Sequence, residues 1–382
     1  MQEQVDNYLA KLIRHALIDN DDAAWLYGLD DEIYTNRAQI DPRVSALFDL
    51  LNINSLIIAR PQRVRWSIIT RLVRDNPGLI CPCDCESLTF IHDIPVVDTF
   101  DVHAVAQALN RRKGCIIADT GIITTGTVSL EQAFISLSSI CFATFVKYFA
   151  DTLNSLHGYC NAPRPDTARI DEALTILSGT APSAFPNPLS CEMPDSETGI
   201  IHAMDAAGKA VVHAGLVDSF FGNISFRKEG MIYISQTGSS LDELPGYIDC
   251  IPLDGSSTCE LTSSSELVAH IKTYERTGDT SILHGHPRFS VIMSMSGPVL
   301  GFDETRFIED IPVVAGEVGA GRYGLMHTLP QAMEKQHAAI VYGHGTFTSC
   351  HGSFHEAFER LSSIEHRCFE AYQDTLSKAG PG

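Results

Sequence analysis

The chain of 382 residues contains an eight-residue segment that occurs twice with one changed letter. Residues 90–97 read FIHDIPVV, and residues 307–314 read FIEDIPVV. The match extends upstream, because SLIIARP begins at Ser55 and SILHGHP begins at Ser281. A repeat of this kind indicates an internal duplication. Whatever fold one half of the chain adopts, we therefore expect the other half to adopt a version of it.

The second copy carries two histidines in a predicted strand. Apolar residues surround His284 and His286, and the strand period of two places both imidazoles on one face, with Cα atoms ~6.6 Å apart. His344, which lies between two glycines after another apolar run, is a candidate third ligand, and Glu266 is a carboxylate upstream. Three histidines and a carboxylate are typical of a catalytic zinc-type site with an open position.

Each of these residues also has an ordinary interpretation. The chain has 15 histidines, so two at alternate positions can occur by chance. Glu266 could complete a Ser-x-x-Glu capping box with Ser263, which would explain it without any chemistry. The order and setting of the residues favour the metal site.

The first copy has lost all three ligand positions. Ile58 and Arg60 replace the first two histidines, and Thr120 replaces the third. We therefore expect residues 1–158 to form a degenerate domain with neither a metal site nor an activity of its own. Too few residues precede its first matched strand to include a counterpart of residues 222–227, so this copy is also predicted to be truncated.

A change in composition separates the two copies. Residues 159–196 are rich in proline and polar residues around one short helical stretch at residues 170–177. Such a composition indicates an interdomain linker. The complete second domain is then predicted to span residues 197–382.

Composition and charge restrict the class of protein. Hydrophobic residues make up 44% of the chain and charged residues 19%, as expected for well-buried globular domains. The net charge of −20 argues against a nucleic-acid or anionic-membrane surface. The N-terminal sequence lacks the apolar core of a signal peptide, and the 11 irregularly spaced cysteines indicate reduced thiols. We expect a cytoplasmic protein.

Two segments of the first copy could suggest other functions. The predicted helix at residues 130–153 is apolar nearly all round, but serines, a threonine and a lysine interrupt it, so burial in a core or interface is favoured over a membrane span. Cys81, Cys83 and Cys85 alternate along the chain. Their spacing is not a standard zinc spacing, and a reduced, partly buried loop is the preferred interpretation.

Several motifs of the second copy occur in the order of a known family. Residues 197–374 resemble the class II aldolase and adducin family, the zinc-dependent sugar-phosphate aldolases and their relatives. The matching segments are residues 222–227, 234–238, 264–266 with His270, 284–287 and 344–345. Gln236 stands where this family usually has proline. The resemblance implies an α/β (α+β) three-layer domain, with a central, mainly antiparallel sheet flanked by helices, present as one complete and one degenerate copy.

The resemblance also implies roles for individual residues. His284, His286 and His344 would hold Zn²⁺, or another divalent ion such as Mn²⁺ or Co²⁺, and Glu266 would be the catalytic acid/base. Glycines at turns and a helix N-terminus favour a bound anion. The implied substrate and phosphate-binding residues are Asn223, Thr237, Gly238, Ser264 and Ser265.

The implied function is that of a metal-dependent aldolase, a carbon–carbon lyase of carbohydrate metabolism. Its substrate would be a small phosphorylated ketose, cleaved through a zinc-stabilised enediolate. A sugar-phosphate 4-epimerase or a decarboxylase on the same scaffold is the alternative, and a non-enzymatic, adducin-like binding role is a further one. We expect a homo-oligomer, dimer or tetramer, whose partner is a small-molecule substrate rather than nucleic acid or membrane.

Overall fold

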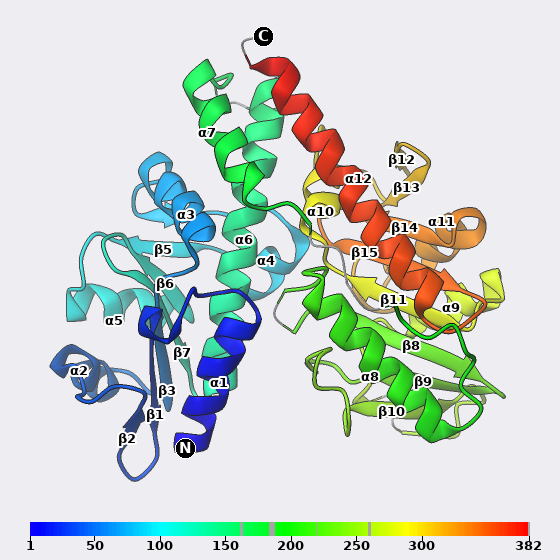
Figure 1. The fold of residues 1–382 in the computed structure, drawn as a ribbon, viewed down its shortest axis with the longest axis horizontal. Coiled ribbons are helices and arrows are strands. Elements are labelled where there is room, and N and C mark those ends of the chain that lie inside the picture. The colour runs from blue at the N-terminus through cyan, green and yellow to red at the C-terminus, as the bar shows by residue number, and fades with distance from the viewer. Residues whose placement is uncertain (161–162, 183–187, 219, 259–260, 381–382) are drawn as a thin grey trace. The chain divides into compact units, whose positions relative to one another are not determined.

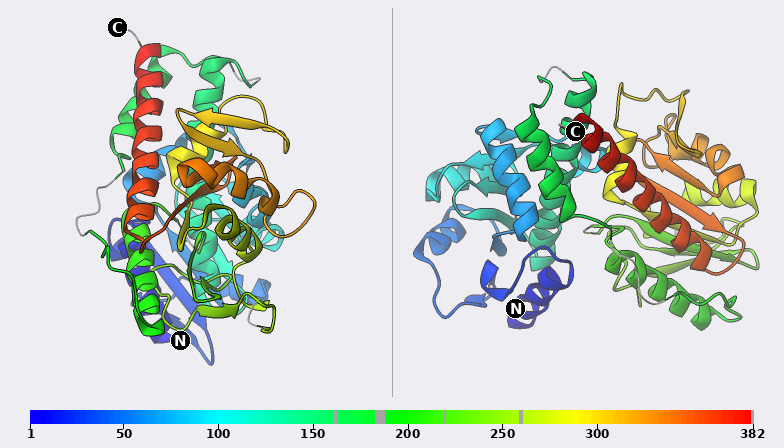
Figure 2. Two further views of the ribbon diagram at one scale, coloured as in Figure 1. Left: turned by 90° about the vertical axis from the view of Figure 1, so that its right-hand side faces the viewer. Right: turned by 45° about the horizontal axis from the view of Figure 1, so that its top comes forward.

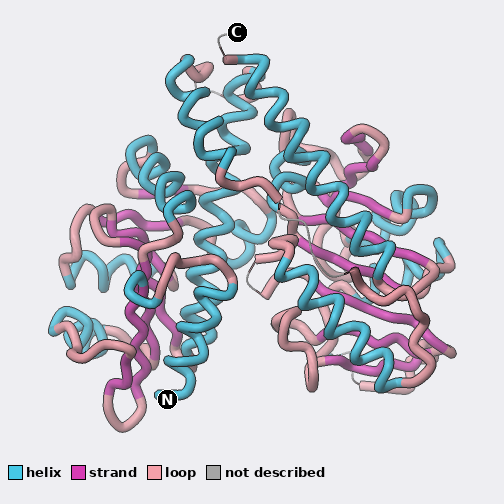
Figure 3. Tube along the Cα trace, viewed as in Figure 1, coloured by secondary structure: helices cyan, strands magenta, loops and turns pink. Residues whose placement is uncertain are grey.

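The computed structural model describes all residues except 161–162, 183–187, 219, 259–260 and 381–382. The chain divides into two compact units, Met1–Phe149 (unit 1) and Ala150–Gly382 (unit 2), with the boundary inside one long helix. The predicted domain limits at residues 158 and 196 stay predictions. In each unit, helices pack on a central sheet (Figure 1, Figure 3).

Unit 1 contains the first seven strands. Its elements in chain order are α1 (Gln2–Arg14), η1 (Asp21–Ala23), β1 (Ala24–Leu29), β2 (Ile33–Thr35), α2 (Pro42–Leu50), β3 (Ser55–Ala59), α3 (Arg63–Asp75), β4 (Leu79–Ile80), α4 (Cys85–Phe90), β5 (Ile94–Val97), α5 (Val102–Arg111), β6 (Gly114–Ile117), β7 (Gly121–Gly126) and α6 (Leu130–His157), which continues into unit 2.

Unit 2 contains the other eight strands. Its elements are α7 (Thr167–Ser178), α8 (Glu197–His213), β8 (Asn223–Lys228), β9 (Met231–Ser235), β10 (Ile248–Pro252), α9 (Leu267–Thr277), β11 (Ser281–Gly285), α10 (Arg288–Ser294), β12 (Thr305–Ile308), β13 (Ile311–Val314), η3 (Leu325–His327), α11 (Leu329–Gln336), β14 (Ala338–Val341), β15 (Gly345–Cys350) and α12 (His355–Ala379).

The two sheets have the same strand order. Unit 1 reads β2-β1-β3-β7-β6-β5-β4, and unit 2 reads β10-β9-β8-β11-β15-β14-β13-β12, so that β10 is an added edge strand. The pairs β5–β6 and β13–β14 are parallel, and the other neighbouring pairs are antiparallel. The predicted three-layer class with a mainly antiparallel sheet is confirmed, and the shared order supports the predicted duplication.

The predicted truncation is wrong in one respect. Strand β1 pairs with β3 as β8 pairs with β11, so that Trp25 lies opposite Ile58 as Asn223 lies opposite His284. Unit 1 therefore has a counterpart of the strand that begins at Asn223. Letter-by-letter comparison missed it because strand pairing depends on the alternation of side chains rather than on their identity. What unit 1 lacks is β10 and most of the segment between β9 and α9.

In unit 2, successive residues of β11 contribute to the two faces of the sheet. Ile282 packs in a cluster with Leu329 of α11 and with residues of α9. Leu283 packs in a cluster with Leu361 of α12 and with residues of α8. The views of Figure 1 and Figure 2 show α8 and α12 along one side of this sheet. Because side chains alternate, His284 projects on the same face as Ile282, toward the side covered by α9 and α11.

Helix α6 is long and apolar enough to cross a membrane by length and composition, but 83% of its most apolar window is buried inside the protein. Its buried threonine is accommodated locally, since the Thr144 hydroxyl donates to the Ile140 carbonyl oxygen one turn earlier (2.7 Å). Burial of this kind is typical of a core helix, as predicted.

In the described part of the chain, the alternating cysteines Cys81, Cys83 and Cys85 form no disulfide. Cys81 and Cys83 are exposed, and Cys85 is partly buried at the start of α4. Asp84 is buried between them, and its Oδ1 accepts a hydrogen bond from the Ser87 amide (3.0 Å), which caps α4. Burial raises the pKa of Asp84 to about 6. Asp84 therefore has a structural role at the start of α4.

Candidate metal centre

The structure brings the three predicted histidine ligands together. His284 lies in β11, His286 follows the same strand, and His344 lies in the turn between β14 and β15. One ring nitrogen from each lies within 4.8 Å of the others, and all three side chains are buried. In the part of the chain that the structure describes, no other three His, Cys, Asp or Glu side chains have ligand atoms this close together.

Glu266 lies beside this group. Its Oε2 is 3.5 Å from His284 Nε2, and its Oε1 is 3.7 Å from His344 Nε2. Helix α9 begins at Leu267, so Glu266 is the N-cap residue itself, and its side chain makes no capping hydrogen bond. The capping-box interpretation is therefore wrong, because the carboxylate faces the histidines instead of the helix end.

Asn223 fixes the orientation of that carboxylate. The Asn223 amide donates from Nδ2 to Glu266 Oε2 (2.6 Å), a buried hydrogen bond between the first residue of β8 and the start of α9. Asn223 was predicted to contact substrate directly, and its Oδ1 accepts no hydrogen bond from any residue that the structure describes. That oxygen remains available for a ligand hydroxyl.

The protonation state of the cluster suits a metal ion. The carbonyl oxygen of Thr346 accepts a hydrogen bond from His284 Nδ1 (3.2 Å), which leaves the lone pair on Nε2, and His286 Nε2 lies 3.0 Å from that atom. Burial lowers the pKa of His284 well below its usual value, and the neighbouring imidazoles of His286 and His344 lower it further. At His284, a neutral imidazole with its lone pair on Nε2 and a backbone partner on Nδ1 is what a transition-metal ion requires of a ligand.

Aromatic rings and glycines shape the surroundings. Phe347 stacks on His284 with centroids 3.8 Å apart, and Phe221 stacks on His286 at 5.3 Å. Gly345 has no room for a side chain, because a Cβ would lie 2.7 Å from His284 Cε1. Gly222 adopts a φ of 77°, and a Cβ there would lie 2.5 Å from the His284 carbonyl oxygen. These glycines let two backbone segments approach the histidines closely.

A buried polar network beneath the histidines was not predicted as part of the site. The Ser225 hydroxyl lies 2.7 Å from His270 Nδ1 and 2.7 Å from the Tyr274 hydroxyl. Burial lowers the pKa of His270 to about 3, so this imidazole is neutral. The sequence contained the signal, since His270 follows Glu266 by one helical turn and therefore lies on the same helix face.

The predicted phosphate-binding residues come from two adjoining segments. Thr237 and Gly238 form an exposed turn after β9, and the Thr237 hydroxyl donates to the Ser263 carbonyl oxygen (2.8 Å). The Ser264 amide donates to the Ser235 carbonyl oxygen (3.0 Å), so the turn and the approach to α9 lie side by side. Ser265 is exposed and directly precedes Glu266, the N-cap residue of α9.

Gln236, the residue that departs from the family pattern, also has a defined place. Its side-chain amide donates from Nε2 to Asp249 Oδ1 (2.7 Å), and Asp249 Oδ2 accepts from the Thr262 hydroxyl (2.7 Å). The turn is therefore held by hydrogen bonds to β10 in place of the rigidity that proline would give.

Residues 202–372 match the family model described as Class II Aldolase and Adducin N-terminal domain. This part of the chain is therefore similar to the class II aldolase and adducin family, as the sequence motifs indicated. Proteins of this superfamily are generally enzymes, and class II aldolases typically depend on a metal ion. No curated protein matches the chain.

Several solved structures are similar to about half of the chain. L-fuculose-1-phosphate aldolase from Thermus thermophilus is 23% identical, with 48% of this chain and 98% of that chain covered and a TM-score of 0.40. YgbL from Klebsiella pneumoniae, a putative aldolase/epimerase/decarboxylase, is 18% identical over 48% and 98% of the two chains, with a TM-score of 0.41. A further L-fuculose 1-phosphate aldolase is 20% identical over 49% and 91%, with a TM-score of 0.39. Likeness at this level carries no inference about the reaction.

Proposed function

We propose that this protein is a metal-dependent, aldolase-type lyase that acts on a small phosphorylated ketose. The observation that carries the proposal is the position of the Glu266 carboxylate, within 3.7 Å of two of three clustered histidine nitrogens. A buried carboxylate beside a metal-ligand set is suited to move a proton next to a polarised carbonyl group.

His284, His286 and His344 would hold the ion, and three imidazoles favour Zn²⁺. When bound, the ion supplies Lewis-acid stabilisation of negative charge on the carbonyl oxygen of the substrate. The protein holds His284 by the hydrogen bond to Thr346 and by the stacked ring of Phe347, so the ligand nitrogen is oriented in advance.

Glu266 is the group that moves the proton. The hydrogen bond from Asn223 Nδ2 restricts the carboxylate to one orientation, and the burial of both side chains excludes competing water. Asn223 Oδ1 can accept a hydrogen bond from a substrate hydroxyl, which would align the substrate with Glu266.

The phosphate group would lie at the exposed turn of Thr237 and Gly238 and at the start of α9, beside Ser264 and Ser265. The N-terminal end of a helix carries partial positive charge and favours an anion. A local binding site of this kind is compatible with a net charge of −20, because the field at the site comes from the nearest groups.

The test is to load the full chain with Zn²⁺ and incubate it with a panel of ketose phosphates while trapping any released aldehyde. Release of an aldehyde that requires Glu266 supports the lyase. Interconversion of epimers or release of CO₂ without an aldehyde would instead support the epimerase or decarboxylase. Normal metal content without turnover of any substrate would overturn the proposal and favour a binding role.

We also propose that the chain forms a homo-oligomer. Large apolar side chains of unit 2 are exposed, with Leu261 at 83%, Val299 at 79% and Phe307 at 62%, and burial of such side chains stabilises association. Light scattering of the full chain would test this proposal, and a monomer would contradict it.

A further inference from the structure

A buried carboxylate of α12 lies outside the set of residues assigned to the reaction. Glu365 is 4% exposed, and both of its oxygens accept hydrogen bonds from backbone amides, Oε1 from Phe289 (2.9 Å) and Oε2 from Ser290 (2.9 Å). Acceptance at both oxygens is the pattern of an ionised carboxylate. The two amides belong to the first turn of α10, where amides lack partners within the helix. Pro287, the N-cap residue of α10, makes no side-chain capping bond, so Glu365 supplies the cap from another helix.

The start of α10 is directly joined to a proposed metal ligand. His286 and Pro287 are the two residues that precede the helix, so a fixed helix start restricts the backbone that carries the His286 imidazole. The Ser290 hydroxyl donates to the Pro287 carbonyl oxygen (2.9 Å) and lies 2.8 Å from the Thr346 hydroxyl. The Thr346 carbonyl oxygen in turn accepts from His284 Nδ1. The capped turn is therefore connected to His286 along the chain and to His284 through hydrogen bonds.

Burial makes this carboxylate energetically costly. It raises the pKa of Glu365 to about 7, while the hydrogen bonds from the Phe289 and Ser290 amides and the charge of Arg288 oppose part of this rise. The Arg288 guanidinium is itself paired with Asp218, at 2.7 and 2.8 Å, so it is not a dedicated partner of Glu365. Proteins tolerate such costs mainly near functional sites, which here are the neighbouring histidines.

Unit 1 shows whether the fold itself requires this carboxylate. In unit 1 the Thr124 hydroxyl donates to the Ala133 carbonyl oxygen (2.8 Å), and in unit 2 the corresponding threonine donates to the Ala357 carbonyl oxygen (2.8 Å). These bonds align α6 with α12 and place Cys141 at the position of Glu365. Cys141 is buried, so the corresponding position in unit 1 holds a small thiol side chain in place of the carboxylate.

The equivalent helix start in unit 1 is capped locally. Helix α3 is the counterpart of α10, since it follows residues 60–61 of the first repeat as α10 follows residues 286–287 of the second. The N-cap residue of α3 is Gln62, and its Oε1 accepts a hydrogen bond from the Val64 amide (3.2 Å). The same arrangement of strands and helices therefore forms without a carboxylate from the long helix. The carboxylate accompanies the histidines.

We propose that Glu365 is a positioning residue for the metal centre. By capping α10 it holds the backbone of His286, so that the imidazole is in place before an ion binds. This inference rests on the proposed role of His286 as a ligand. Because Glu365 bonds to the backbone after His286 and not to the imidazole, its effect is on the affinity and geometry of the centre rather than on the chemical step.

The experiment measures the affinity of the metal-free full chain for Zn²⁺ by competition with a chromophoric chelator at pH 8, above the pKa of Glu365. Glu365→Gln keeps the size of the side chain, but its amide accepts at one oxygen only and turns an NH₂ group toward a backbone N–H. Its affinity is expected to be about 10-fold lower than that of the parent, as for other groups that orient metal ligands. The absorption spectrum of bound Co²⁺ is expected to change as well, because it depends on the ligand geometry.

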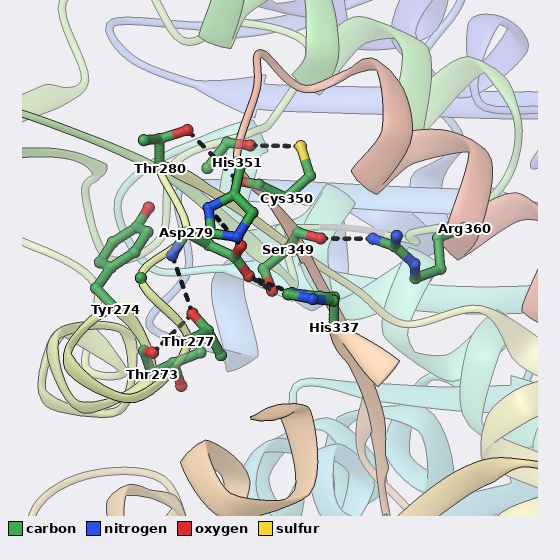
Figure 4. Close-up of polar contacts among 12 residues, drawn as sticks. Thr273, Tyr274, Thr277, Asp279, Thr280, His337, Ser349, Cys350, His351 and Arg360 are labelled. Atoms are coloured by element: carbon green, nitrogen blue, oxygen red, sulfur yellow. Dashed lines mark hydrogen bonds and ion pairs between the residues drawn. The ribbon is translucent and has the colours of Figure 1, made fainter. Parts of the chain in front are cut away.

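The matched control is a second buried carboxylate of unit 2, near the opposite end of β11. Asp279 is fully buried, and its Oδ2 accepts from the Ser349 hydroxyl (2.5 Å) and from His337 Nδ1 (2.8 Å) (Figure 4). Five residues of extended chain, at ~3.3 Å per residue, separate it from His284 by ~16 Å. Asp279→Asn is expected to lower the unfolding temperature but to leave the Zn²⁺ affinity and the Co²⁺ spectrum as in the parent.

A second variant, Ser290→Ala, removes the hydroxyl bond to Pro287 and changes no charge, and it is expected to bind Zn²⁺ about fivefold more weakly. Parent-like affinity in Glu365→Gln would overturn the proposal. If that variant does not fold, parent-like affinity in Ser290→Ala would overturn it instead. An equal loss in Asp279→Asn would also do so, because any destabilised chain would then bind less metal. Since no step uses turnover, failure here is distinct from failure of the proposed activity.

Discussion

Strands β3 and β7 of unit 1 and strands β11 and β15 of unit 2 pair in the same register but carry different chemistry. Ile58 lies opposite Ile123 in unit 1, and His284 lies opposite Phe347 in unit 2. Ile58 packs in an apolar cluster with residues of α2 and α5. His284 contacts two other imidazoles and a carboxylate. Strand pairing therefore sets the same backbone positions in both units. The side chains at those positions alone decide whether they can bind a metal ion.

In unit 1, the guanidinium of Arg60 connects two segments at the position where unit 2 carries His286. Arg60 Nη2 donates to the Asp119 carbonyl oxygen (2.7 Å) and Nε donates to the Thr120 carbonyl oxygen (3.2 Å), while the guanidinium lies 4.9 Å from the centre of the Trp66 ring. These bonds join the end of β3 to the turn before β7. In unit 2 the corresponding segments carry the three histidines, which a shared metal ion would join.

The largest effect is expected from replacing His284, the proposed metal ligand whose position in unit 1 is occupied by Ile58. His284→Ala should remove the metal at the histidine cluster and reduce turnover on the order of 10⁴-fold, because a Lewis acid supplies several kcal/mol of transition-state stabilisation. Metal analysis and turnover measure this. Ile58→Val is the control in unit 1, expected to cost ~1 kcal/mol of stability and to leave metal content unchanged. A His284→Ala chain that binds as much metal as the parent would show that the histidine cluster is not the site.

The next largest effect tests whether Glu266 acts as the acid/base group or only supports the fold. Glu266→Gln should keep the metal and the fold but lower turnover on the order of 10²–10⁴-fold, because the amide cannot exchange the proton. Asp41 is the N-cap of α2, which precedes β3 as α9 precedes β11, and Asp41→Asn is the matched control. It should leave turnover unchanged. Parent-like turnover in Glu266→Gln would mean that the carboxylate only supports the structure.

The response to acid should also distinguish the units. The pKa of His270 is about 3 in the folded protein and near 6.5 when unfolded, so below pH 6.5 only the unfolded chain takes up this proton. This histidine therefore costs unit 2 about 2 kcal/mol of stability at pH 5, relative to pH 7. Unit 1 has no buried histidine, since His15, His92 and His103 all reach solvent.

Denaturant unfolding of the metal-free chain at pH 7 and pH 5 tests this. His270→Gln should reduce the loss of stability of unit 2 between the two pH values, whatever its effect at pH 7 alone. The transition of unit 1 should respond in the same way in parent and variant. An unchanged pH dependence of unit 2 would contradict a buried, neutral His270.

The smallest effect concerns the guanidinium in unit 1. Arg60→Ala should lower the stability of unit 1 by about 1 kcal/mol, because two exposed hydrogen bonds to carbonyl oxygens are lost. Arg74→Ala is the control, because it also removes an exposed arginine, this one on α3. It should change the stability of unit 1 less. Equal effects in calorimetry would mean that Arg60 does not hold the turn.

Much of the histidine cluster could be predicted from the sequence, because its geometry is local. The strand period alone puts His284 and His286 on one face, and the flanking glycines mark the turn that carries His344. The role of Glu266 could not be decided in this way. A cap and a catalytic carboxylate both belong at a helix start, and only the observed start of α9 at Leu267 separates the two.

The features that sequence reasoning missed depend on contacts between distant segments. Asp279, His337 and His351 have no common motif, and the sheet alone brings them together. Asn223 belonged to a recognised segment, but its hydrogen bond to Glu266 spans 43 residues, and no spacing rule predicts such a pair. Local periodicity predicts which face a side chain occupies, and tertiary packing decides what it meets.

The pairing of β3 with β7 has a consequence for the order in which the chain is made. It joins Ser55 to Gly126, which are 71 residues apart, and the matching pair Ser281 and Cys350 is 69 residues apart. Each half must therefore close a long loop before its central strands meet, which is a slow step in folding. Since domains fold from the N-terminus during synthesis, unit 1 can complete its sheet before the ribosome has added His284.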